Sequence, residues 1–398
     1  MPNLNTRRFT NPDILGKIRP ASLVTWLTPA KEYLATRGVT LPADVADGPV
    51  DLEKLAAVFL DPDPDMPRDL VESLNLVNEM ATDEAMEAIL EAQGPRKFTL
   101  EVGDKPSPAD VAVQTLLLNR LLLEELHNEH QLTRPRSFEY FVCEGDEPPK
   151  FTPPGKEQIE ALEARLDDWY AKSKRGRGCK VIPFPKEGEC WFLVRHGLPC
   201  KRESAMVEGE SSSVFYRPQK HDVVVYDTMQ GELRMNCCGK RELELFRKAF
   251  GLHLFGKEEF FPGTGKYRLK PLLMGRGCLA CLDIEGMESV TLKEVQFLFG
   301  GKPWQRVTRA SDDIYGLVEK EKLFWPEDPE RIKRATFEIK FAGSKKPRRV
   351  TIIPSNKAQY GRDDDGIIIE NWLKERGFIG EDDDNETDET ETGIVDKS

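Results

Sequence analysis

Four residues between positions 222 and 234 have the types and spacing of a metal-dependent nuclease site. Asp222 and Asp227 precede Glu232 across a predicted hairpin turn, and Arg234 follows two residues later. Carboxylates from neighbouring strands can hold Mg²⁺, which orients a water molecule for hydrolysis. Such sites usually carry a lysine where this chain has Arg234, and arginine cannot serve as a base. Because acids beside a hairpin are common on ordinary surfaces, a magnesium-dependent nuclease is an alternative hypothesis rather than the leading one.

Cysteine spacing offers a second kind of chemistry. Cys278 and Cys281 form a single CxxC pair, and Cys237 and Cys238 are adjacent. A structural zinc site needs four ligands, and adjacent cysteines lack the usual gap within a ligand pair. We interpret these cysteines as buried thiols, with zinc binding as the open alternative. The chain has eight cysteines and no visible secretory signal, which predicts reduced thiols.

Two further groups combine ligand or nucleophile types: Glu124, His127 and His130, and Cys200, His196 and Asp222. The first group lies at helical spacing, but a dinuclear site would need a second Glu-x-x-His, which the chain lacks. The second group has no local signature of an activated nucleophile. We therefore predict no catalytic residue, no metal and no cofactor from either group.

The most specific pattern lies in residues 291–354. The sequence Thr291–Glu294 fits a helix-capping box, and the apolar residues after it predict a short helix. A glycine break follows, and Pro303 can begin a second helix running to about residue 322. Two strand-like runs, 335–341 and 348–353, then flank a basic tip. Helix, glycine turn, helix and basic hairpin in this order resemble the winged helix-turn-helix family of DNA-binding motifs.

The resemblance implies that the second helix enters the major groove and that the hairpin holds phosphates. The implied groove residues are Lys302, Gln305, Arg306 and Arg309. The implied phosphate clamp consists of Lys345, Lys346, Arg348 and Arg349. Arginine and glutamine read base edges, whereas lysine and arginine bind phosphates. Asp312, Asp313 and Glu319 place acid on the supposed reading helix, which argues against the motif.

The elements that must position these residues predict an α+β fold. It comprises a helical N-terminal domain, a mixed α/β middle domain, a winged-helix-like C-terminal lobe and a disordered acidic tail. In the helical domain, one long helix is predicted to begin near Ser107, marked by the apolar residues Val111, Leu117, Leu118, Leu121 and Leu122. The predicted boundaries are 1–19 for an N-terminal tail, 20–143 for the helical domain, 144–155 for a proline-rich linker, 156–290 for the middle domain, 291–380 for the lobe and 381–398 for the acidic tail.

Composition supports a core-forming, soluble protein. The chain has 398 residues, of which 39% are hydrophobic and 32% charged. No apolar run approaches the ~18 residues that a membrane helix needs. The net charge is −12, but the last 18 residues alone hold nine acids and one lysine. Such a stretch cannot bury enough apolar area to offset ordering, which predicts disorder there.

These patterns lead to a functional expectation. The leading hypothesis is a non-enzymatic, cytoplasmic binding protein that engages a polyanion, above all DNA, through the helix-turn-helix and the basic hairpin. The alternative from another class is a protein-interaction subunit that docks a partner through its N-terminal helices and makes no nucleic-acid contact. Neither hypothesis involves a membrane.

Overall fold

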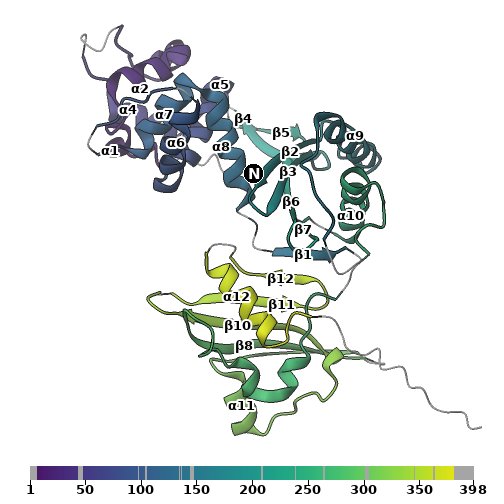
Figure 1. The fold of residues 1–398 in the computed structure, drawn as a ribbon. Coiled ribbons are helices and arrows are strands. Elements are labelled where there is room, and N and C mark those ends of the chain that lie inside the picture. Colours follow the sequence, from purple (N-terminus) through teal and green to yellow (C-terminus); the bar gives the residue numbers. More distant parts are fainter. Residues whose placement is uncertain are drawn as a thin grey trace, which may run out of the picture. The chain divides into compact units, whose positions relative to one another are not determined.

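The computed structural model divides into two units, Met1–Gln131 and Leu132–Ser398, which are described separately (Figure 1). The residues it describes are 7–43, 48–96, 98–103, 105–133, 135, 137–143, 148–207, 209–237, 239–262, 265–300, 304–344, 346–361 and 364–380. The predicted acidic tail, 381–398, lies outside this range. No helix in the described ranges has the length and apolar character to cross a membrane.

The first unit is helical, as predicted. Its α-helices are α1 (Pro12–Leu15), α2 (Pro20–Leu27), α3 (Lys31–Thr36), α4 (Leu52–Leu60), α5 (Arg68–Met80), α6 (Asp83–Arg96), α7 (Pro108–Leu118) and α8 (Arg120–Leu132). Asp51 caps α4 by accepting a hydrogen bond from the Lys54 amide at 3.0 Å. The predicted N-terminal tail is wrong in its described part, because Phe9, Leu15 and Ile18 are buried in the core of this unit.

The predicted long helix after Ser107 is also wrong, because it is two helices. The α7 helix ends at Leu118, and α8 begins at Arg120. Between them, Asn119 leaves helical geometry, and its side-chain oxygen accepts a hydrogen bond from the Leu122 amide at 3.1 Å. Asparagine competes in this way with a continuous helix, because its side chain satisfies amides that a helix start leaves unpaired.

The second unit is built on antiparallel strands. These are β1 (Ser137–Val142), β2 (Lys180–Lys186), β3 (Glu189–Gly197), β4 (Lys201–Val207), β5 (Glu210–Tyr216), β6 (Gln219–Asp227), β7 (Glu232–Asn236), β8 (Met287–Phe299), β9 (Gln305–Ala310), β10 (Ile332–Phe341), β11 (Arg348–Ile353) and β12 (Lys357–Gln359). Ten of them form one sheet in the order β2-β3-β6-β7-β1-β12-β11-β10-β8-β9, and β4 pairs only with β5. Strands from the predicted middle domain and from the predicted lobe therefore share one sheet.

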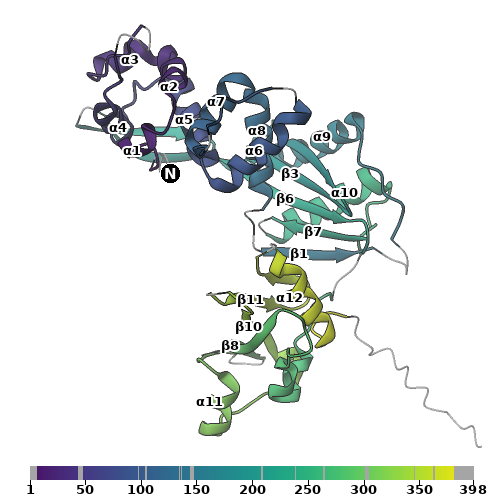
Figure 2. The same cartoon turned by 60° about the vertical axis from the view of Figure 1, so that its left-hand side comes forward.

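Helices cover this sheet from both sides. The helices α9 (Lys156–Lys172) and α10 (Lys240–Phe255) pack on one face of β2, β3, β6 and β7, where Phe192, Phe246 and Phe250 are fully buried (Figure 2). We call this side the sealed face. On the opposite face, α11 (Ile314–Glu321) and α12 (Asp364–Glu375) join a second core with β8, β10 and β11.

The helix-turn-helix prediction at 291–322 is wrong. Residues 287–299 form strand β8, and 305–310 form strand β9, while α11 is the only helix described there. A β-bulge explains the error, since Thr336 pairs with Glu294 and the next residue, Phe337, pairs with Leu292. The extra residue puts Leu292 and Val295 on the same buried face although they are three apart. That spacing imitates a helix. The flanking hairpin, β10 and β11, is confirmed.

Candidate functional sites

The residues predicted to read the DNA groove do not share a surface. Gln305, Arg306 and Arg309 lie on the edge strand β9. Strand alternation puts Arg306 and Arg309 on opposite faces, whereas a helix would have placed them together. The Arg309 guanidinium lies 5.5 Å from the centre of the Phe297 ring and donates a hydrogen bond to the Phe324 carbonyl. Lys302 lies outside the described residues.

The predicted phosphate clamp lies at the β10–β11 hairpin, and two of its arginines contact acids. Arg348 forms an ion pair with Asp365 at 2.7 Å, and Arg349 lies 3.6 Å from Glu294. The Arg349 side chain is nevertheless 68% exposed, and Lys346 is exposed. Lys345 lies outside the described residues. Arg349 and Arg306 share the sheet face turned away from the second core.

The three acids of the nuclease hypothesis do not form a common site. Asp222 and Asp227 are five residues apart on β6, so their side chains lie on opposite faces of the sheet. Glu232 pairs directly with Asp227 and shares its face. Glu189 on β3 pairs with Asp227 from the other side. Sequence reasoning missed Glu189, although strand alternation combined with the hairpin register would have found it.

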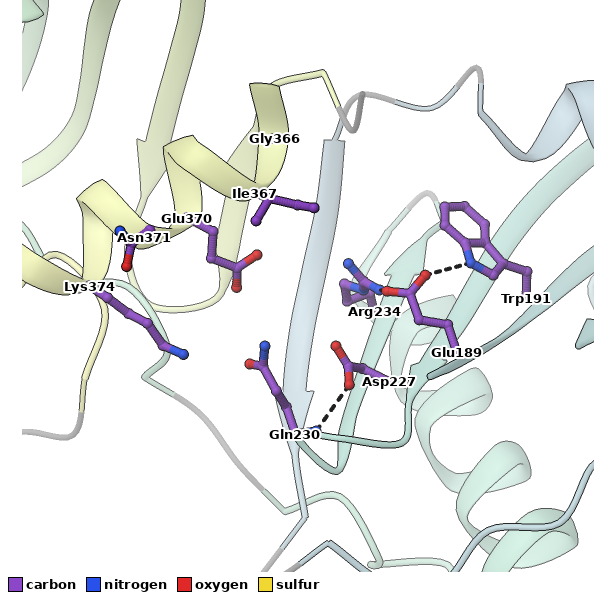
Figure 3. Close-up of a pocket in the computed structure, with 10 residues that line it drawn as sticks. All are labelled: Glu189, Trp191, Asp227, Gln230, Arg234, Gly366, Ile367, Glu370, Asn371 and Lys374. Atoms are coloured by element: carbon purple, nitrogen blue, oxygen red, sulfur yellow. Dashed lines mark hydrogen bonds and ion pairs between the residues drawn. The ribbon is translucent and has the colours of Figure 1, made fainter. Parts of the chain in front are cut away.

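Two of these three carboxylates, Glu189 and Asp227, line a pocket of about 550 Å³ beside α12 (Figure 3), whereas Glu232 is buried behind them. Like charges opposite one another destabilise a sheet unless cations compensate them. Arg234 forms an ion pair with Glu189, and Lys266 lies 2.6 Å from Glu232. Burial would lower the pKa of Arg234, but the carboxylates around it raise that pKa on balance. Burial raises the pKa of Glu232, against the opposing effect of Lys266.

The pocket walls differ in chemistry. The strands contribute Trp191, whose indole N–H donates to Glu189 at 2.7 Å, and the helix contributes Ile367, which is 78% exposed. Figure 3 shows Glu370 and Lys374 of α12 facing Gln230 and Asp227 across the opening. A pocket of this size can accommodate a small polar molecule or a side chain of a partner. Asp227 itself accepts two amide hydrogen bonds from its own turn.

A second charged group lies on the sealed face of the same strands. His196 on β3, Asp222 on β6 and Glu242 on α10 are at most 3% exposed. The His196 Nε2 atom is 2.7 Å from Asp222 Oδ2 and 3.8 Å from Glu242 Oε1. Lys220 pairs with Asp222 at 2.5 Å, and Arg175 pairs with Glu242 at 2.6 Å. We refer to His196, Asp222 and Glu242 as the buried triad.

The remaining candidates from the sequence have ordinary partners or stay apart. Cys278 and Cys281 are buried, and burial raises the pKa of both thiols. In the described ranges, these two cysteines have no third ligand-type side chain close enough to share a metal. His127 pairs with Glu79 at 2.6 Å. Cys200 is exposed, unlike His196 and Asp222. Cys238 lies outside the described residues.

The helical unit carries an exposed apolar surface at the α7–α8 break. Leu117, Leu118 and Leu121 are 39%, 58% and 72% exposed. Leu117 lines two hollows, one of about 370 Å³ that includes Trp26 and Leu70, and one of about 630 Å³ that includes Leu118. We call the three leucines the leucine patch.

Comparison with known proteins gives no relative from which a function could be carried over. No model of a known protein family matches the chain, and no curated protein matches it.

Proposed function

We propose that this protein is a non-enzymatic interaction protein whose helical unit docks a partner protein. The observation that carries the proposal is the leucine patch, three neighbouring leucines exposed beside two hollows. Single exposed leucines are normal, but a contiguous apolar patch beside a hollow is typical of a binding surface. Val111 of the same predicted stripe is buried in the unit's own core, and the proposed partner covers only the exposed leucines.

The shape and charge of the surroundings favour an amphipathic helix as the bound element. Apolar side chains spaced three and four residues apart on such a helix would enter the two hollows on either side of Leu117. Charged pairs border them, since Arg120 pairs with Glu124 at 2.8 Å and Arg19 pairs with Asp110 at 3.2 Å. Polar groups at the border of an apolar centre are the usual anatomy of protein interfaces.

The test compares two leucines of equal exposure. Leu121 is 72% exposed within the patch, and Leu60 is 71% exposed at the end of α4, outside the patch. The full chain and its Leu121→Asp and Leu60→Asp variants are expressed in the native host, cross-linked and purified, and the bound proteins are quantified by mass spectrometry. We expect a specific partner with the unchanged chain and with Leu60→Asp, and at least about tenfold less with Leu121→Asp.

Two outcomes contradict the proposal. One is the absence of any partner above the background of an unrelated bait. The other is equal recovery of every partner with both variants. Circular dichroism and urea unfolding establish that both variants stay folded, as expected for exposed positions.

A second candidate function is binding of a polyanion such as DNA, and exposed basic side chains favour it. Arg349, Lys346 and Arg306 are exposed on and beside the β8–β11 part of the sheet. Phosphate contacts by such groups make affinity fall as salt rises. Fluorescence anisotropy with duplex DNA at low and physiological salt tests this candidate.

The matched variants for that titration are Arg349→Ala and Lys320→Ala. Lys320 is 82% exposed on α11. If Arg349 contacts a phosphate, its loss weakens binding and reduces the salt slope by about 1, whereas loss of Lys320 changes neither. No binding at low salt, where attraction between charges is strongest, would remove this candidate.

A further inference from the structure

The buried triad brings together ligand atoms from three separate elements. His196 comes from β3, Asp222 from β6 and Glu242 from the first turn of α10. One nitrogen or oxygen of each lies within 4.8 Å of those of the other two, and no other such group occurs in the part of the chain that the structure describes. Three converging N and O ligands are the number that open zinc sites use.

Hydrogen bonding leaves a positive charge to be supplied between His196 and Asp222. The Nδ1 atom of His196 is 3.0 Å from the Gly197 carbonyl, which can only accept, so Nδ1 carries a proton. The Nε2 atom is 2.7 Å from Asp222 Oδ2, and an ionised carboxylate also only accepts. Two lone pairs cannot face each other at that distance. In this structure a second proton therefore lies between Nε2 and Oδ2, and a tetrahedral zinc ion taking its place would move the two atoms slightly farther apart.

The surroundings resemble the shell that orients a metal-bound histidine. In metal sites the second ring nitrogen commonly donates to a backbone carbonyl, as Nδ1 does to Gly197 here. The Tyr170 ring stacks on the imidazole with centroids 4.3 Å apart and an angle of 10°, which fixes the ring plane. The ring orientation is thus set before any ion binds.

One buried carboxylate oxygen gives independent support for a bound cation. Glu242 Oε1 accepts hydrogen bonds from Arg175 at 2.6 Å and from Tyr170 at 3.5 Å. Glu242 Oε2 is buried and has no hydrogen-bond partner among the described residues. An unsatisfied oxygen on a residue that is 1% exposed costs free energy, which a bound cation would offset.

We propose that His196 Nε2, Asp222 and Glu242 form a zinc-binding site. An imidazole nitrogen combined with two carboxylates suits Zn²⁺ better than Mg²⁺ or Ca²⁺, which take oxygen ligands almost exclusively. The Lys220 side chain is 22% exposed although its Nζ atom is buried, so zinc binding requires this ammonium group to move away from Asp222. Cys237 follows the end of β7 beside the carboxylates of Asp222 and Glu242. It is one candidate for a fourth ligand, and a water molecule is the other.

The experiment uses the full chain, stripped with chelator and then dialysed against buffer with a small excess of ZnCl₂. Zinc content is measured by plasma mass spectrometry, and thermal unfolding is followed with and without the metal. We expect one equivalent of zinc per chain and a higher unfolding midpoint when zinc is present. Co²⁺ in place of Zn²⁺ is expected to produce visible absorption bands.

Matched variants separate the site from adventitious binding. Glu242→Gln keeps the volume and the contact with Arg175 but removes the charge, and Asp227→Asn makes the same kind of change on the opposite face. We expect Glu242→Gln to lose the stoichiometric zinc and Asp227→Asn to retain it. The proposal is overturned if the unchanged chain binds no zinc after loading, or if Glu242→Gln binds it as tightly as the unchanged chain. The zinc content of the unchanged chain does not depend on any variant. It can therefore overturn the proposal even if Glu242→Gln fails to fold.

Discussion

Strands β3, β6 and β7 carry two charged clusters that contain the same residue types but have different access to solvent. Near one strand end, Glu189 and Asp227 line the pocket, and Glu232 is buried beside them. Near the other end and on the opposite face, Asp222 and its partners lie beneath α9 and α10. Carboxylates next to cations occur in both places. The two clusters differ in what covers them, since α9 and α10 lie over only one of the two. This cover determines which cluster a ligand can reach.

The comparison teaches that the same ion pair has different energetic consequences on the two faces. At the pocket, Glu189 and Asp227 are half-buried and reach water, which screens their charges, whereas the Glu232–Lys266 pair is nearly as buried as the triad. On the sealed face, His196, Asp222 and Glu242 are at most 3% exposed, and removal of one of them leaves a buried partner without its contact. Asp222 and Asp227, five residues apart on one strand, therefore play different parts in the molecule.

The largest expected effect comes from Asp222→Ala. It leaves Lys220 and His196 without their carboxylate, and we expect a loss of about 3–5 kcal/mol in the free energy of unfolding. Asp227→Ala removes hydrogen bonds within a solvated turn and is expected to cost about 0.5–1.5 kcal/mol. Urea unfolding of both variants measures the difference. Equal losses would show that the two faces do not differ in this way.

A second test uses apolar residues on the same hairpin. Leu233 is fully buried on the sealed face, and Leu233→Ala is expected to cost about 2–5 kcal/mol through the cavity it leaves. Met229, in the turn beside the pocket, is 76% exposed, so Met229→Ala is expected to change stability by less than about 0.5 kcal/mol. A comparable loss at both positions in urea unfolding would mean that Met229 is covered in solution.

The smallest effect concerns pH. Burial on the sealed face raises the pKa of Cys190 from 9.0 to about 12. The unfolded thiol therefore ionises while the folded thiol stays protonated, so the stability it confers is complete below pH 9 and falls as pH rises toward 12. At pH 10 the loss from this thiol is about 1 kcal/mol.

The Cys190→Ala variant isolates that contribution. Between pH 7 and pH 10, its free energy of unfolding is expected to fall by about 1 kcal/mol less than that of the unchanged chain. Cys200→Ala, at an exposed position, serves as the control and is expected to follow the unchanged chain. An identical pH dependence for Cys190→Ala would mean that the folded thiol ionises as readily as the unfolded one.

Much of the local structure was predictable from short stretches of sequence. The Asp51 cap, the prolines that begin α2 and α7, and the strand pair around the turn at 227–231 depend on neighbours within a few residues. The α+β class follows from such elements. Predictions of secondary structure failed where contacts between residues distant in sequence determine the fold. Leu292 and Val295 have helical spacing because of a β-bulge in the pairing with β10.

The candidate sites were less predictable than the fold. The sequence drew attention to Asp227, Glu232 and Arg234, but it did not exclude Asp222 from their site. The sheet face on which a side chain lies depends on the pairing register and on unbroken alternation along the whole strand. The sequence also grouped His196 with the exposed Cys200 rather than with Glu242. Glu242 lies on a helix that reaches His196 only through tertiary packing.

The sequence by itself determined the kinds of elements, their approximate limits and the alternation of apolar and polar side chains along them. These features follow from short-range sterics and capping, which a local stretch contains in full. Only the tertiary structure decided which sheet face α9 and α10 cover, and hence which carboxylates are sealed. It likewise decided that the leucines at the α7–α8 break stay exposed, because burial depends on what packs against a surface and not on the surface alone.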